Sequence, residues 1–249
     1  AVINTLRGRL SFEPAMVHLD EYPFSEAETQ RFERVVLLGM GTSLHAAMVG
    51  RTWFESLTGI PTEVDNSSEF RYRDPILNNH TLVISISQSG ETADTLAAME
   101  EAERKGSKQL TLVNYEGTQT SRIADGSILI RAGLEIGVAA SKTFVCSLTS
   151  LYLLAVHMGI LRRTTSTDQL ASISRELASL PNQLGALLGK ETQYEYLARK
   201  FAKHSDFLYL GRGLSYPLAM EGALKLKEIS YIHAEGYPAG EMKHGPISL

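Results

Sequence analysis

The chain has 249 residues, which is the length of one large domain or two small ones. A chain of this length can bury a hydrophobic core without help from disulfides or metal ions. Apolar residues make up 43% and charged residues 21%, which excludes a disordered chain and a coiled coil. The formal net charge of −4 argues against a general nucleic-acid binder, and the single cysteine, Cys146, excludes an intramolecular disulfide.

Short apolar runs and helical patterns alternate in the first part of the chain. Strands are expected at 35–38, 62–66, 81–87, 109–114 and 127–131, and helices at 43–57, 92–105 and 141–161. The repeated strand–helix–strand order predicts parallel βαβ units with helices on both faces of a sheet. The last helix lies in the longest apolar stretch, but its hydroxyl groups and His157 favour a buried helix over a membrane span.

A polar segment at 162–167 marks the best domain boundary. Helices are expected at 168–188 and 191–204, and a strand at 207–210. We therefore divide the chain into four parts. They are a linker and N-terminal helix at 1–34, a first subdomain at 35–161, a helical connector at 162–206 and the start of a second subdomain at 207–249.

An internal repeat supports this division. Residues 37–74 and 209–246 align without gaps and share 10 identities in 38 positions, where chance gives about two. Two unrelated strand–glycine–helix turns are the alternative, but they would not extend to the aligned pairs Glu63/Glu235 and Glu69/Glu241. The repeat predicts a duplicated unit whose second copy is incomplete.

The segment Ser87-Gln88-Ser89-Gly90-Glu91-Thr92 follows the strongest strand and opens a helix. Its hydroxyl groups, its amide and the free N–H groups of a helix N-terminus suit a phosphate. A serine N-cap and turn without a ligand is the alternative interpretation. A second candidate, Gly39-Met40-Gly41-Thr42-Ser43, has the same strand-end position but lacks the full dinucleotide-binding fingerprint.

The third candidate runs from Glu221 to His244. The spacing within this segment places three residues on one helix face: Glu221, Lys225 and Glu228. They form either a catalytic group or a solvated stripe of salt bridges. His233 and His244 follow, and a structural histidine is the default interpretation for each. A glutamate base and a histidine acid near a phosphate site would suit proton transfer beside a carbonyl group.

Five motifs resemble the sugar isomerase (SIS) family. They are residues 39–43, 87–92, 135–139 (Glu-Ile-Gly-Val-Ala), 221–235 and 240–246 (Gly-Glu-Met-Lys-His-Gly-Pro). The resemblance covers essentially the whole chain and is strongest to members that make glucosamine 6-phosphate from fructose 6-phosphate and glutamine. It implies an α/β fold with a three-layer αβα, flavodoxin-like parallel sheet, duplicated, with the second copy truncated.

The resemblance also implies roles for individual residues. Phosphate-binding roles are implied for Thr42, Ser43, Ser87, Gln88, Ser89 and Thr92. Glu228 matches the base that moves a proton between C1 and C2, and Lys225 a lysine beside these carbons. His244 matches a histidine that a neighbouring subunit supplies for ring opening, and Val138 a loop residue whose backbone contacts the sugar.

The resemblance implies a sugar-phosphate substrate, a homodimer in the cytoplasm, and no metal, cofactor, nucleic acid or membrane. It further implies that a glutaminase domain precedes this segment and that a lysine-bearing tail follows it, so both ends are expected to be cuts in a longer protein. Two alternatives stay open. They are a stand-alone SIS isomerase or deaminase and a sugar-phosphate-sensing regulatory module.

Overall fold

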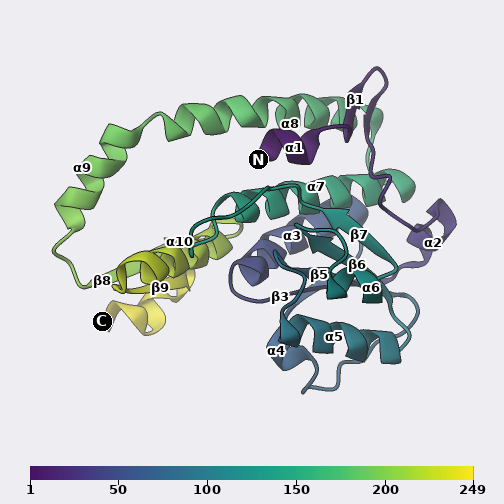
Figure 1. Ribbon diagram of the computed structural model, residues 1–249, viewed down its shortest axis with the longest axis horizontal. Coiled ribbons are helices and arrows are strands. Elements are labelled where there is room, and N and C mark those ends of the chain that lie inside the picture. Colours follow the sequence, from purple (N-terminus) through teal and green to yellow (C-terminus); the bar gives the residue numbers. More distant parts are fainter. Residues whose placement is uncertain (249) are drawn as a thin grey trace. The chain divides into compact units, whose positions relative to one another are not determined.

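The computed structural model describes residues 1–248 and divides into two compact units (Figure 1). The first unit comprises residues 1–136 and 140–174, and the second comprises residues 137–139 and the chain from 175 onward. Each unit contains its own parallel strands.

A five-stranded parallel sheet forms the centre of the first unit. Its strands are β3 (Arg34–Gly39), β4 (Thr62–Asn66), β5 (Thr81–Ile86), β6 (Lys108–Val113) and β7 (Gly126–Leu129), in the order β4-β3-β5-β6-β7. Every residue of β5 is buried, which explains why its sequence is mostly apolar and does not alternate with charged residues. The predicted strand at 127–131 ends at Leu129, and Arg131 beyond it has a left-handed φ of +52° that a strand cannot include.

Helices cover both faces of this sheet (Figure 1). They are α3 (Thr42–Thr58), α4 (Ser67–Phe70), α5 (Ala93–Arg104), α6 (Gln119–Ile123) and α7 (Lys142–Leu161). α3 packs against α7 on one face, and α5 packs with α4 and α6 on the other. Val36 and Val83 point toward Ala98 of α5 in one core, so the predicted three-layer αβα arrangement is confirmed.

Within the described residues, α7 is the one helix long and apolar enough to cross a membrane. Most of its residues are buried, and it packs against α3 and α1. A core helix meets the same criteria of length and composition as a membrane span. Its packing agrees with the buried helix predicted from the sequence.

The N-terminal segment contains more structure than the single helix expected there. It forms α1 (Val2–Leu6), a hairpin of β1 (Leu10–Phe12) and β2 (Ala15–Val17), and α2 (Glu26–Arg31). The buried guanidinium of Arg9 donates to Glu21 Oε1 at 2.7 Å and to the Leu129 carbonyl at 2.8 Å. These bonds join the segment to the end of β7.

Helices α8 (Thr167–Leu188) and α9 (Glu191–Phe201) lead into the strands of the second unit. There β8 (Asp206–Gly211) pairs in parallel with β9 (His233–Pro238) across helix α10 (Ser215–Ser230), and the 3-10 helices η1 (Ala239–His244) and η2 (Pro246–Ser248) follow. The strand predicted at 207–210 and the two predicted helices are therefore present. The second helix ends at Phe201, three residues before its expected end.

The β8–β9 pair has the same register as the β3–β4 pair, displaced by 172 residues. Val35 lies opposite Thr62, and Phe207 lies opposite Ala234. A Cβ on Gly39 would collide with the backbone of Ser43, and a Cβ on Gly211 would collide with that of Ser215. The same strand–glycine–helix geometry thus occurs in both units. It supports the sequence repeat, and a duplication of the whole domain stays a prediction.

Candidate functional site

The sheet of the first unit has a topological switch point. β3 pairs with β4 on one side and with β5 on the other. Open parallel sheets bind ligands beyond the carboxyl ends of strands at such a point. The loops that follow β3 and β5, at residues 39–43 and 87–92, lie at this edge of the sheet.

The loop after β3 brings the backbone close to the start of α3. Gly39 allows this approach, and Gly41 has a φ of +50° at the N-cap position. The N-cap residue Gly41 has no side chain to cap the helix. The N–H groups of Ser43 and Leu44 donate to the Met40 carbonyl at 3.0 and 3.4 Å, so what this helix start offers a ligand is its partial positive charge. Thr42 and Ser43, both half-buried, occupy this first turn.

Two serines of the loop after β5 accept hydrogen bonds from the loop's own backbone. Ser87 Oγ accepts the N–H of Gly90 at 3.0 Å, and Ser89 Oγ accepts the N–H of Glu91 at 3.2 Å. A hydroxyl group that accepts one hydrogen bond still has its own proton to donate. Both serines are therefore set to act as donors.

Three more of the predicted phosphate-binding residues have side chains that are free to donate to a ligand. Within residues 1–248, the Ser43 and Thr92 hydroxyls and the Gln88 amide make no hydrogen bond. Thr92 occupies the N-cap position of α5 without capping it. Neutral hydroxyl and amide donors and the starts of two helices thus lie at one edge of the sheet, an arrangement suited to a phosphate group.

The second unit holds its own candidate group, an ion-pair network on α10. Lys225 Nζ lies 2.6 Å from Glu228 Oε2 and 3.4 Å from Glu221 Oε1. The predicted shared face is therefore confirmed. A solvated stripe does not describe it, because the Glu221 side chain is only 7% exposed. The ammonium group holds two carboxylates on one helix face, where a carboxylate can accept a proton from a bound substrate.

His244 and Val138 also belong to the second unit. His244 lies in η1 with an exposed side chain. Val138 is 93% exposed and groups with the second unit by its contacts. The predicted phosphate-binding residues thus lie together in the first unit, and the predicted catalytic residues lie in the second.

His233 has a structural role, the default interpretation that the sequence analysis gave it. Its Nδ1 lies 3.1 Å from Asp206 Oδ1, and its Nε2 lies 3.2 Å from Glu235 Oε1. Asp206 begins β8, while the histidine and Glu235 belong to β9. The imidazole therefore joins the two strands.

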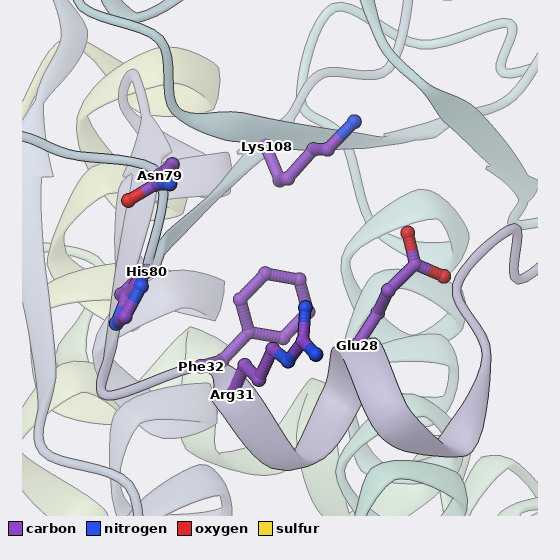
Figure 2. Close-up of a pocket in the computed structure, with 6 residues that line it drawn as sticks. All are labelled: Glu28, Arg31, Phe32, Asn79, His80 and Lys108. Carbon is purple, nitrogen blue, oxygen red and sulfur yellow. The ribbon is translucent and has the colours of Figure 1, made fainter.

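A cavity of about 200 Å³ opens at the opposite, amino edge of the first sheet (Figure 2). It is lined by Glu28, Arg31, Phe32, Asn79, His80 and Lys108. His80 pairs with Glu33 and Lys108 with Asp125, each at 3.1 Å. None of the predicted site residues lines it. Among the described residues no group of three or more His, Cys, Asp or Glu side chains is placed to hold a metal ion.

Comparison with known proteins decides the family. The SIS domain profile matches residues 30–157 and 200–249, more than half of the chain. The chain belongs to the SIS domain family. This confirms the family predicted from the five sequence motifs.

Two relatives of this chain carry the same name. Glutamine–fructose-6-phosphate aminotransferase [isomerizing] of Methanosarcina acetivorans is 47% identical over 249 residues, which cover 100% of this chain and 40% of that protein. The protein of the same name from Gloeobacter violaceus is 52% identical over 218 residues, covering 87% of this chain and 36% of that protein. The chain thus spans about two fifths of the length of these relatives.

Solved structures agree with the family. The C-terminal domain of glucosamine-fructose-6-phosphate aminotransferase from Francisella tularensis has a TM-score of 0.93 at 35% identity. This similarity covers 100% of the SIS chain and 69% of that structure. A putative phosphosugar isomerase from Silicibacter pomeroyi has a TM-score of 0.75 at 29% identity, over 89% of this chain and 64% of that one.

Proposed function

We propose that the SIS chain is the isomerase portion of a glutamine–fructose-6-phosphate aminotransferase. In the full-length protein it would convert fructose 6-phosphate and glutamine-derived ammonia to glucosamine 6-phosphate. The similarity to the C-terminal domain of the Francisella tularensis enzyme over the entire chain carries this proposal. The name that the relatives share over 87–100% of the chain supports it.

The phosphate of the substrate would bind at the switch point of the first sheet. Ser87 and Ser89 would donate their free protons to it, and Thr92 and Ser43 would add donors from the starts of α5 and α3. Thr42 and Gln88 complete the proposed set. Phosphate binding would supply energy to position C1 and C2, which lie at the other end of the sugar.

Proton transfer would take place at α10. Glu228 would move a proton between C1 and C2, and Lys225, 2.6 Å away, would hold that carboxylate in position and neutralise its charge. His244 would assist opening of the sugar ring in a neighbouring subunit. The backbone of Val138 would contact the sugar.

The proposal includes the partners of the segment. A glutaminase domain of the same full-length chain would supply ammonia. A homodimer in the cytoplasm would allow one subunit to lend its His244 to the site of the other. The Lys225–Glu228 pair favours an enzyme over a sensing module, because a module that only binds a sugar phosphate needs no base.

Replacement of Glu228 by Gln in the full-length protein tests the base assignment. We expect isomerisation of fructose 6-phosphate to fall about 10²–10⁴-fold, the usual contribution of a general base. Lys227 is exposed on another face of α10, so Lys227→Gln is the matched control and should keep wild-type activity. Near wild-type isomerisation by Glu228→Gln would refute the assignment.

A further inference from the structure

Glu91 places a carboxylate inside the loop proposed to bind a phosphate. By Coulomb's law a negative charge there opposes anion binding. Both carboxylate oxygens are nevertheless engaged by one residue of α6. Oε1 accepts the backbone N–H of Gln119 at 2.9 Å, and Oε2 accepts the side-chain Nε2–H of Gln119 at 2.6 Å.

The start of α6 contacts the same loop at Gly90 as well. The N–H of Thr120 donates to the Gly90 carbonyl at 3.1 Å. Gly90 has a φ of +67°, and a Cβ at this position would lie 2.5 Å from Thr118 Oγ1. The backbone of residues 90 and 91 is thus held against α6 by hydrogen bonds and by close packing.

This backbone also determines where the phosphate donors point. Ser87 Oγ accepts the N–H of Gly90, and Ser89 Oγ accepts the N–H of Glu91. A displacement of residues 90 and 91 would release both serine hydroxyls from these orientations. A side chain that is no longer held in one orientation binds a ligand more weakly, because binding must then cost the entropy of fixing that orientation.

We propose that Glu91 is a positioning residue, which clamps the 87–92 loop to the N-terminus of α6 and so keeps the loop in its anion-binding shape. This inference rests on the proposed function, since it assigns a role within the same phosphate site. The clamp acts through hydrogen bonds to Gln119 and not through the charge of the carboxylate.

Two effects of removing Glu91 have opposite signs, which makes the inference testable. Loss of a nearby negative charge strengthens phosphate binding. Loss of two hydrogen bonds that hold the loop weakens it, and hydrogen bonds to a charged group correspond to about tenfold or more in an equilibrium constant. The direction in which phosphate affinity changes therefore shows whether Glu91 acts by holding the loop or only by its negative charge.

The experiment uses the full-length protein. For Glu91→Ala we expect a rise of about tenfold in KM for fructose 6-phosphate, with kcat within about twofold of wild type, and a matching rise in the Kd of inorganic phosphate measured by calorimetry. Glu91→Gln keeps the size of the side chain and can exchange hydrogen bonds with Gln119, so both constants should return to within about threefold of wild type.

Two further variants complete the design. Gln119→Ala removes one of the two bonds, so it should raise both constants less than Glu91→Ala, and the double variant should equal Glu91→Ala because both changes act on one interaction. Glu116→Ala is the control. Glu116 is an exposed carboxylate near α6 that makes no hydrogen bond or ion pair within residues 1–248.

An unchanged or lower phosphate Kd for Glu91→Ala would overturn the inference, as would a Glu91→Gln variant impaired as much as Glu91→Ala. The proposed function fails separately, if the wild-type protein does not convert fructose 6-phosphate. Phosphate affinity then still tests the clamp. Thermal unfolding of each variant excludes global misfolding, and Gln119→Ala tests the clamp if Glu91→Ala does not fold.

Discussion

Single residues in the loop after β5 determine which hydroxyl protons stay uncommitted. Ser87 and Ser89 use their oxygens to accept backbone N–H groups, which leaves their protons for a ligand. Gly90 makes this geometry possible, because its φ of +67° and the proximity of Thr118 exclude a larger residue.

Replacement of Gly90 by Ala should therefore lower the free energy of unfolding by more than the left-handed φ alone would cost, because the added Cβ also collides with Thr118. Gly106→Ala is the matched control, since Gly106 has a φ of +77° with nothing within 4 Å of an added Cβ. We expect the control to lose about 1–2 kcal/mol in free energy of unfolding, and Gly90→Ala to lose about 2 kcal/mol more from the clash. Urea unfolding of the two variants gives this difference, and equal losses would contradict it.

At the scale of elements, α7 takes its N-terminal cap from a side chain of the preceding loop. Ser141 at the N-cap position makes no side-chain hydrogen bond. Glu135 instead accepts the N–H of Thr143 at 3.0 Å and its hydroxyl at 2.9 Å. Burial raises the pKa of the Glu135 carboxyl, but these bonds outweigh that effect and hold its pKa below 4.5.

This lowered pKa predicts a pH dependence of stability. A carboxylate with a depressed folded pKa stabilises the fold above its unfolded pKa of 4.5, and this contribution disappears as the pH falls through the folded value. Glu135→Gln should lose about 1 kcal/mol at pH 7, as for loss of a helix cap, and should match wild type near pH 2. Chemical unfolding across this range measures it. A deficit that persists at low pH would show that the charge is not involved.

A comparison of the predicted and observed helices and strands shows which of them the sequence pattern can identify. β4 and the long helices were predicted closely, because apolar periodicity and glycine stops are local. The hairpin of β1 and β2 and the short helices α4 and α6 were missed. Each is too short to have a periodic pattern, and bonds to distant residues such as Glu91–Gln119 hold them.

At the scale of the whole molecule, the two units bury their strands to different extents. In β5 the side chains of Leu82, Val83 and Ile84 are fully buried between two helical layers. In β8 the side chains of Leu208 and Leu210 are 38% and 44% exposed. Within the described residues β8 pairs only with β9.

Hydrogen exchange of the 249-residue chain should reflect this difference. Amides of residues 81–86 should be the most protected, because their exchange requires opening of the whole sheet. Amides of residues 206–211 should exchange at least about 100-fold faster, since few buried contacts hold them. Mass spectrometry of peptides covering the two strands measures both rates. Equal protection would contradict the difference between the units.

The sequence by itself determined the parallel α/β class, the family, the two strand-end loops and the shared face of Glu221, Lys225 and Glu228. These features depend on local patterns and on motifs within one element. Only the tertiary structure decided that the loops after β3 and β5 meet at one switch point, because strand order is set by pairing between distant segments. It also decided that Glu91 is turned to Gln119 and that Glu135 caps α7. Glu91 and Gln119 are 28 residues apart and Glu135 and Thr143 eight, and in neither case does a local sequence pattern mark the pair, because the path of the intervening loop decides it.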